Sequence, residues 1–382
     1  MIIKKLYNIV LLISILSVLK CFSKKNNYLY VGENLYFSTV ESALQECIDN
    51  YGGLQNVETS IFIKSGTYRP KYPLRFSVFG ETSSINFIGE GIDKTILECH
   101  TLNKLIAFQA NSEYQHHVWT FKDMTMKGCE KKSEMVNVSS GTINFINVKF
   151  TGNINAGAVV IEGATNANFN NTIFVDNYEG PNISLGTSGN IGIYNSKILG
   201  FPECFNHNKL CKNNLVNILS HDSVNLIIEN SEISNSIHTE NNIDFNANDF
   251  MTSIGAINFS SITIANSLFK NTNSYISGAL SLAYWKLELV PTLNVYNTSF
   301  INNMGSQASV IRVAGRVNVN FQDCYFYNNT ASAYGLFVNG GDLSADGIIF
   351  SSKFEISNSY FENPWENDYE VRFIKLKNKL LK

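Results

Sequence analysis

Hydrophobic and polar positions alternate in short stretches along most of this chain, and one such stretch returns many times. Its clearest form is NTSFINN at residues 297–303, and related copies lie at 147–153, 171–177 and 323–329. We count each copy from its apolar anchor residue. The first anchors are 24 residues apart, and later intervals range from 26 to 36 residues. A minimum period with occasional insertions is typical of a solenoid of stacked coils. The anchors are Met126, Phe150, Phe174, Ile198, Ile233, Phe269, Phe300, Phe326 and Phe361.

The columns around the anchor define the shape of each coil. The residues seven and five places before the anchor are nearly all apolar, which predicts a β-strand with one buried face. The anchor is also apolar but has the opposite parity, so the chain must bend between them. Three places before the anchor every copy has Asn or Asp, which tolerate left-handed backbone angles. We predict that these side chains turn inward and bond from coil to coil as a structural ladder. The ladder residues are Asp123, Asn147, Asn171, Asn195, Asn230, Asn266, Asn297, Asp323 and Asn358.

A second element recurs after the motif, for example AGAVVIEG at 156–163 and SGALSLAY at 277–284. It begins with small residues and continues as a strand, so we expect it to form another wall of the coil. At the other end of the chain, the pattern at 38–50 predicts a short amphipathic helix, with Ser38 or Thr39 as its N-cap. Such a helix can cover the open end of a solenoid core.

These segments carry a resemblance to known families. The helix TVESALQECI with IFIKSGTY and INFIGEGIDKTIL, over residues 38–97, resembles the opening of the pectin lyase-like superfamily. Units such as FTGNINAGAVV look like the repeats of polymorphic outer-membrane proteins, which also occur in surface and secreted proteins of amoebae. The first Gly of their G-G-A element is replaced here by Ala, Ile or Ser. The resemblance covers roughly residues 38–363 and implies an all-β fold. That fold is a right-handed parallel β-helix of roughly ten coils with an N-terminal capping helix.

The first 23 residues predict a secretory signal, because Lys4 and Lys5 precede an apolar run from Leu6 to Leu19. A membrane anchor is the alternative, although the run is short for a bilayer span. We expect the remainder, 24–382, to form one β-helix domain in an extracellular setting. Residues 364–382 would form a C-terminal cap or tail. A shortened member of a larger surface-protein family is a further possibility.

Without residues 1–23 the chain has 26 basic and 32 acidic side chains, a net charge of −6. This balance argues against a nucleic-acid partner. Asn is abundant, and a surface of amides and hydroxyls suits contact with carbohydrate or cell-surface proteins. It suits a plain solvated exterior equally well.

Six cysteines follow the signal, and an even number in a secreted chain permits disulfides. Cys204 and Cys211 are seven residues apart in one insertion, so we predict that they bond to each other. The partners of Cys47, Cys99, Cys129 and Cys324 stay open. Among the N-x-[ST] sequons we expect glycans on some of Asn137, Asn170 and Asn182. We expect none on Asn297, because its side chain should face inward.

Catalysis on acidic polysaccharides needs carboxylates on neighbouring coils, together with cations or calcium. The two outward columns that can be aligned, six and eight places before the anchor, contain no such pairs. Three weaker groups remain: the His221–Asp222 pair, the His116–His117 pair, and His238, Glu240, Asp244 and Asp249 in one insertion. None has the spacing of a catalytic or metal site, so we predict no catalytic, metal or cofactor residues and no cofactor.

The sequence therefore favours a secreted, non-catalytic β-helix protein with an extended surface for adhesion, matrix or carbohydrate contact. The alternative is a divergent polysaccharide lyase or esterase. An acidic cluster across three adjacent coils in a groove would favour the enzyme, and a flat amide-rich surface would favour the binding protein.

Overall fold

The computed structural model describes residues 25–51, 57–76, 83–99, 105–108, 117–129, 134–153, 157–163, 165–177, 180–186, 189–200, 217–235, 252–274, 277–284, 289–331, 337–340 and 353–362. The predicted signal, the insertions around Cys204 and Asp244, and the predicted C-terminal cap lie outside these residues.

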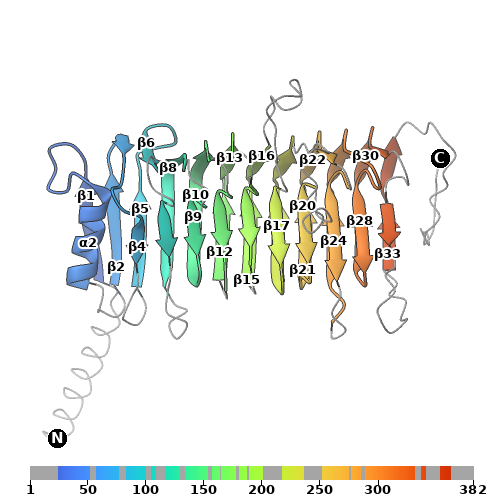
Figure 1. Ribbon diagram of the computed structural model, residues 1–382, viewed down its shortest axis with the longest axis horizontal. Coiled ribbons are helices and arrows are strands. Elements are labelled where there is room, and N and C mark those ends of the chain that lie inside the picture. The colour runs from blue at the N-terminus through green and yellow to red at the C-terminus, as the bar shows by residue number, and fades with distance from the viewer. Residues whose placement is uncertain are drawn as a thin grey trace, which may run out of the picture.

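The described chain is a parallel β-helix. Its strands follow one another along the long axis of the molecule, with the helix α2 (Val40–Tyr51) at one end (Figure 1). Each strand pairs in parallel with the equivalent strand one coil earlier and one coil later. Three walls result, which we call A, B and C, and the predicted all-β solenoid is thereby confirmed.

Wall A is formed by the strand that precedes the bend in each coil. Its strands are β1 (Lys25–Val31), β2 (Val57–Ile63), β5 (Ser83–Ile88), β8 (Val118–Lys127), β10 (Gly141–Thr151), β12 (Thr165–Asn170), β15 (Gly189–Tyr194), β18 (Val224–Glu229), β21 (Ser261–Ala265), β25 (Thr292–Tyr296), β29 (Asn318–Gln322) and β33 (Lys353–Ser357).

Wall B follows the bend, and the long strands β8 and β10 run through both walls. Its other strands are β3 (Gly66–Tyr68), β6 (Thr95–Glu98), β13 (Ile173–Val175), β16 (Lys197–Leu199), β19 (Glu232–Ser234), β22 (Leu268–Lys270), β26 (Ser299–Ile301), β30 (Tyr325–Tyr327) and β34 (Tyr360–Glu362).

Wall C is a separate sheet that contains the second recurrent element, as predicted. Its strands are β4 (Leu74–Phe76), β7 (Ile106–Phe108), β9 (Val136–Val138), β11 (Val159–Ile161), β14 (Ile183–Leu185), β17 (Ile218–His221), β20 (Ile254–Ile257), β24 (Leu280–Tyr284), β28 (Ile311–Gly315) and β32 (Phe337–Gly340). A small third sheet joins β23 (Asn273–Ser274), β27 (Met304–Gly305) and β31 (Thr330–Ala331).

The apolar columns meet inside the solenoid in the register that the sequence pattern predicts. The anchors pair in order from Met126 to Phe361, and the apolar column five places before them does the same. Their rings stack from coil to coil. For example, the ring centroids of Phe150 and Phe174 are 4.7 Å apart and those of Phe300 and Phe326 are 5.3 Å apart. One continuous core runs along the molecule as a result.

Helix α2 lies where the sequence places it. Thr39 is the N-cap, because its Oγ1 accepts a hydrogen bond of 3.2 Å from the backbone N–H of Ser42. Val40, Ala43, Leu44 and Cys47 are buried on one face of the helix, in the same core as the first strands. Among the described residues, no helix combines the length and the apolar character that a membrane crossing requires.

Most of the described repeat copies bend twice. The first bend is at the predicted ladder residues, all of which have positive φ, from 42° at Asn297 to 56° at Asp123. A second bend lies two places after the anchor, for example at Asn271 (55°) and Asn302 (53°). Asn and Asp occupy the left-handed region at a lower energetic cost than other residues with a side chain. The recurrence of these residues is therefore explained by the backbone conformation of the two bends.

The predicted inward orientation of the ladder is wrong. Most of its side chains, including Asn171, Asn266 and Asn297, are exposed. They do bond between coils on the outside: Asn147 Nδ2 donates to Asp123 Oδ1 (2.6 Å), and Asn297 Nδ2 donates to Asn266 Oδ1 (2.9 Å). The period-two alternation of the strand breaks at the bend. The left-handed residue faces outward, and the residue after it turns inward.

From Thr172 onward, the inward column next to the first bend consists mostly of hydroxyls. Those of Ser196, Ser231, Ser267, Thr298 and Ser359 each accept a hydrogen bond from the backbone N–H of the counterpart one coil earlier. Ser196 accepts one of 3.0 Å from Thr172, and Ser231 one of 3.1 Å from Ser196. The bend interrupts the strand ladder, so these N–H groups need another acceptor. Cys324 occupies this column in a later coil, and its own N–H donates to Ser359 Oγ at 3.1 Å.

The inward amides are the Asn residues that end the motif, three places after the anchor. Asn303 is fully buried, and its Nδ2 donates to the backbone oxygen of Phe269 (3.1 Å). Its Oδ1 accepts from the N–H of Thr272 (3.3 Å), while Asn329 Oδ1 accepts from the N–H of Asn303 (3.0 Å). Asn177 forms the same contacts earlier in the chain: its Oδ1 accepts from the N–H of Asn153 (3.1 Å) and its Nδ2 donates to the Phe150 oxygen (3.3 Å). Asn153 Nδ2 donates instead to the Gly157 oxygen (2.8 Å).

We expect Asn297→Ala to lower the free energy of unfolding by about 1 kcal/mol, the usual penalty of a left-handed residue with a Cβ. Asn297→Gly should leave it within about 0.5 kcal/mol of wild type, because glycine adopts this angle without strain. Urea unfolding of both variants measures the difference. Equal, large losses in both would mean that the Asn297 amide stabilises the fold more than the backbone angle does.

Candidate functional site

The outer side of wall A is the most regular surface of the described chain. We call its outward residues on β10, β12, β15, β18, β21, β25 and β29 the amide face. They are Thr142, Asn144, Ile146, Asn166, Asn168, Asn170, Asn190, Gly192, Tyr194, Asn225, Ile227, Glu229, Ser261, Thr263, Ala265, Thr292, Asn294, Tyr296, Asn318, Asn320 and Gln322. The parallel register aligns them in three columns, and equivalent positions on adjacent strands are about 4.8 Å apart.

The amides of this face bond to one another along the columns. Asn168 Nδ2 donates to Asn144 Oδ1 (2.9 Å), and Asn225 Nδ2 donates to Asn190 Oδ1 (3.0 Å). Asn190 Nδ2 in turn donates to Asn166 Oδ1 (3.0 Å). A primary amide has two N–H groups and two lone pairs, so each retains capacity for an external partner after this bond. The hydrogen bonds fix the side chains in place and reduce the entropy that binding would otherwise cost.

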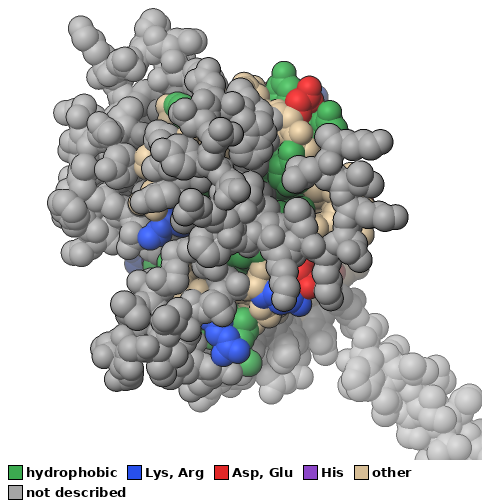
Figure 2. Space-filling model, turned by 90° about the vertical axis from the view of Figure 1, so that its right-hand side faces the viewer, with side chains coloured by type: hydrophobic (Ala, Val, Ile, Leu, Met, Phe, Trp, Pro, Cys, Tyr) green, Lys and Arg blue, Asp and Glu red, His purple; other side chains and the backbone are tan. Residues whose placement is uncertain are grey.

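The amide face carries almost no charge. Glu229 is the only Asp, Glu, Lys, Arg or His among the residues that define it. Away from this face, several acidic groups are paired with cations, for example Glu232 with Lys270 (2.9 Å) and Glu98 with Arg69 (2.6 Å). In the view onto the C-terminal end, the described charged side chains also lie in small separate groups (Figure 2).

A shallow groove of about 410 Å³ runs beside the amide face, along the first bend. Exposed ladder amides line one side, and wall B residues line the other. Its lining consists of Asn195, Ser196, Lys197, Asn230, Ser231, Glu232, Asn266, Ser267, Leu268, Asn297 and Ser299. Four coils contribute to it, so a ligand seated there would lie along the solenoid axis. The predicted ladder residues Asn195, Asn230, Asn266 and Asn297 thus meet at a concave surface.

Carboxylates at the N-terminal end are held in the charged form. Glu90 accepts hydrogen bonds from Ser65 Oγ (2.6 Å) and Lys64 Nζ (2.9 Å), and these lower its pKa to about 2. The hydrogen bond from Arg69 lowers the pKa of Glu98, and burial opposes it. Groups of this kind are ionised at neutral pH and therefore unsuited to act as general acids. In the described ranges, no three His, Cys, Asp or Glu side chains are grouped as metal ligands would be.

The three weaker groups of His, Asp and Glu residues that the sequence suggested either form no site in the structure or lie outside the described residues. His221 ends β17, whereas Asp222 and Ser223 form a positive-φ turn into β18. His117 is buried near Trp119, which is in the core as predicted. His116, His238, Glu240, Asp244 and Asp249 are outside the described residues.

The glycosylation candidates separate by burial. Asn170 is exposed and Asn137 is half-buried. The accessibility expected for Asn182 is wrong: it is 4% exposed, accepts from Asn177 Nδ2 (2.9 Å) and donates to Asn217 Oδ1 (2.8 Å). A glycan at Asn182 is incompatible with these contacts. The steric reason against a glycan at Asn297 no longer holds, because that side chain is exposed. Asn170 belongs to the outward side of β12 and pairs with Tyr194 in the strand register, so a glycan there would cover that surface. Glycosylation at Asn137 remains our prediction.

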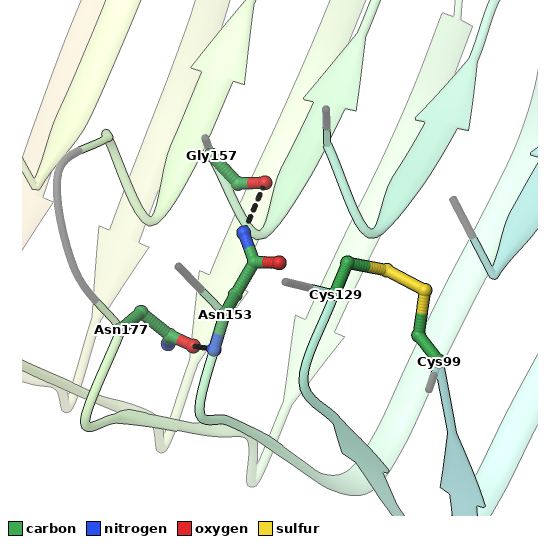
Figure 3. Close-up of a disulfide and its surroundings, with 5 residues drawn as sticks. All are labelled: Cys99, Cys129, Asn153, Gly157 and Asn177. Atoms are coloured by element: carbon green, nitrogen blue, oxygen red, sulfur yellow. Dashed lines mark hydrogen bonds between the residues drawn. A yellow bond between two sulfur atoms is a disulfide. The ribbon is translucent and has the colours of Figure 1, made fainter. Parts of the chain in front are cut away.

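The cysteines that the structure describes form one disulfide, between Cys99 and Cys129. It lies at the same corner of the solenoid as the inward amides Asn153 and Asn177 of the following coils (Figure 3). The bridge thus crosses from one coil to the next where later coils use buried hydrogen bonds. The predicted Cys204–Cys211 pair is outside the described residues and stays a prediction.

Cys324 should resist alkylation in the folded protein. It is buried without a disulfide partner, and burial raises the pKa of its thiol to about 11. Only the thiolate reacts, so iodoacetamide at pH 8 should label Cys324 only after unfolding. Mass mapping of native and urea-unfolded protein measures this. Rapid labelling of Cys324 in the native protein would contradict its burial in the inward column next to the first bend.

Neither a protein family nor a curated protein matches this chain at the level of sequence. Among solved structures, it is similar to a pectin methylesterase from Aspergillus niger, with 13% identity and a TM-score of 0.43. That match covers 73% of this chain and 88% of the esterase. It is also similar to the pectate lyase Pel9A, with 11% identity, a TM-score of 0.40, and coverage of 90% of this chain and 78% of the lyase.

A third similar structure is PfbA, a surface adhesin of Streptococcus pneumoniae. Here the identity is 9%, the TM-score is 0.38, and the match covers 85% of this chain and 88% of the adhesin. At such values the likeness concerns the parallel β-helix alone, and no site is transferred from these proteins.

Proposed function

We propose that this protein is a secreted, non-catalytic β-helix protein whose amide face binds carbohydrate at a cell surface or in a matrix. The observation that carries the proposal is the array of amides and hydroxyls over seven adjacent strands, many of them hydrogen-bonded to one another between β10 and β21. Sugars present dense hydroxyl groups, each a donor and an acceptor, and side-chain amides match both roles. The long flat array would contact several sugar units at once.

The parallel coils support this role because they make the array rigid. Each Asn is held by backbone pairing and by the stacked core below it, and Asn144, Asn166, Asn168, Asn190 and Asn225 are also held by column bonds. A pre-organised surface loses little conformational freedom when it binds. The alternative enzyme would need carboxylates gathered on neighbouring coils. The described carboxylates Glu90, Glu98 and Glu232 are instead each paired with a cation.

Substitution of the amide face tests the proposal. The triple variant Asn166→Ala, Asn168→Ala and Asn190→Ala removes three amides at the centre of the array. The matched control, Ser184→Ala, removes a polar group from the outer side of wall C. In co-sedimentation with a panel of insoluble polysaccharides, the triple variant should bind at least about tenfold more weakly than wild type, which is about 1.4 kcal/mol. The control should bind normally. Equal binding by all three proteins would exclude the amide face as the binding surface.

A further inference from the structure

One aromatic residue of the amide face occupies space that a glycine leaves open. Tyr194 lies over Gly192, two residues earlier on β15. A Cβ added at Gly192 would lie 2.6 Å from the phenolic oxygen and 2.7 Å from Cζ of Tyr194. The neighbouring strands have side chains at the equivalent position, Asn168 and Ile227. The phenol ring therefore folds back along the surface of wall A.

The surroundings of this ring combine apolar and polar groups. Ile227, which pairs with Gly192 one coil further on, is 43% exposed and extends the apolar surface. Asn168 lies one coil earlier and is held by its bond to Asn144 (2.9 Å). Asn190 and Asn225 form the adjacent column. An aromatic surface with fixed amides around it matches a pyranose ring, which has C–H groups on its faces and hydroxyls around its edge.

The negative charge near Tyr194 favours the binding of neutral sugars over acidic sugars. Glu229 pairs with Tyr194 in the strand register and is the only ionisable carboxylate of the amide face. An acidic polysaccharide would place like charges beside it, and no cation of the amide face would offset the repulsion. A neutral sugar meets no such repulsion, and its hydroxyls can donate to the carboxylate.

From this arrangement we propose that Tyr194, seated over Gly192 and bordered by Ile227, is the stacking position for a sugar ring of a neutral polysaccharide. The inference rests on the proposed function and specifies its ligand class. The amides of Asn168, Asn190 and Asn225 bind the hydroxyls of the same chain, and Glu229 excludes acidic chains.

The test measures binding of the full chain to cellulose, chitin and galactomannan as neutral probes and to polygalacturonate as the acidic probe. Tyr194→Ala removes the ring. Gly192→Ala keeps the tyrosine but forces its ring out of position, and φ at Gly192 lies outside the left-handed range, so alanine introduces no backbone strain. Tyr194→Phe retains the ring without its hydroxyl. Tyr327→Ala is the matched control: it removes an exposed tyrosine ring from β30 in wall B, outside the amide face.

We expect at least one neutral probe to bind wild type, and both Tyr194→Ala and Gly192→Ala to bind it about tenfold more weakly. Tyr327→Ala should bind like wild type, Tyr194→Phe should retain most of the binding because it keeps the ring, and polygalacturonate should not bind. Neutral binding that is unchanged in Tyr194→Ala and Gly192→Ala would overturn this inference and leave the proposed function intact, as would binding of polygalacturonate alone. Failure of wild type to bind any polysaccharide would overturn both. Self-association that these variants abolish, without polysaccharide binding, would assign the surface to a second copy of the chain.

Discussion

Replacing Cys99 and Cys129 together by alanine will lower the free energy of unfolding by about 3–4 kcal/mol. The bridge closes a loop of 30 residues, and the chain-entropy model gives about this value for a loop of that length. The loss should concentrate in the first coils, because each coil of a solenoid contacts only its neighbours. Urea unfolding measures the total, and hydrogen exchange of β6 and β8 measures its location.

Reductant provides the internal control for this prediction. Wild type with dithiothreitol should unfold at the urea concentration of the reduced double variant, whereas the double variant should lose only what the predicted Cys204–Cys211 pair contributes. Cys324→Ser, which alters a buried thiol without breaking a bridge, should behave like wild type in both conditions. A wild-type midpoint that is insensitive to reductant would mean that the bridge contributes nothing to stability.

Asn303→Ala will be the most destabilising change among the polar positions of the repeat motif, by about 2–4 kcal/mol. It leaves the Thr272 N–H and the Phe269 oxygen without their partners inside the core. A buried polar group that loses its partner costs about 1–3 kcal/mol. Calorimetry and urea unfolding measure the effect.

The neighbouring residue is the matched control. Asn302 is exposed and has a φ of 53°, and glycine adopts that angle freely. Asn302→Gly should therefore change stability by less than about 0.5 kcal/mol. Equal stability of Asn303→Ala and Asn302→Gly would contradict the claim that the buried amide column stabilises the corner of each coil.

The sequence pattern predicted the strand register in full because stacked coils repeat the same local problem. From Met126 to Phe361 each anchor meets its predicted partner, and the bends occur at the predicted Asn and Asp residues. The prediction was wrong about the direction of the Asn or Asp side chain at the first bend of each coil. Side chains of a strand alternate between its two faces, but a left-handed residue shifts this alternation by one position. The sequence pattern alone does not show whether the Asn or Asp points inward or outward at that shift.

The inward amides could have been found from the same columns. Asn153, Asn177, Asn303 and Asn329 all lie three places after an apolar anchor, and Cys129 occupies that position after Met126. The aligned position of Cys129 is a signal for the disulfide corner, although not for its partner Cys99. Tyr194 could not have been singled out, because only the packing of its ring over Gly192 distinguishes it from Tyr296.

The amide columns were visible in the sequence six and eight places before the anchor, but only the structure shows whether their side chains are ordered. A surface loop of Asn residues and a rigid array of Asn residues have the same composition. The column bonds from Asn166 to Asn225 identify this one as an ordered array. Its low charge is a property of wall A and does not follow from the net charge of the chain.

The most direct measurement of the central claim follows binding and turnover in one experiment. The full chain is incubated with each neutral polysaccharide and with polygalacturonate, with and without calcium. Bound protein is quantified beside newly formed reducing and unsaturated sugar ends. We predict saturable binding to a neutral polysaccharide and no release of sugar ends from any substrate. Release of sugar ends that an acidic-cluster variant abolishes, or the absence of binding to every polysaccharide, would contradict the account.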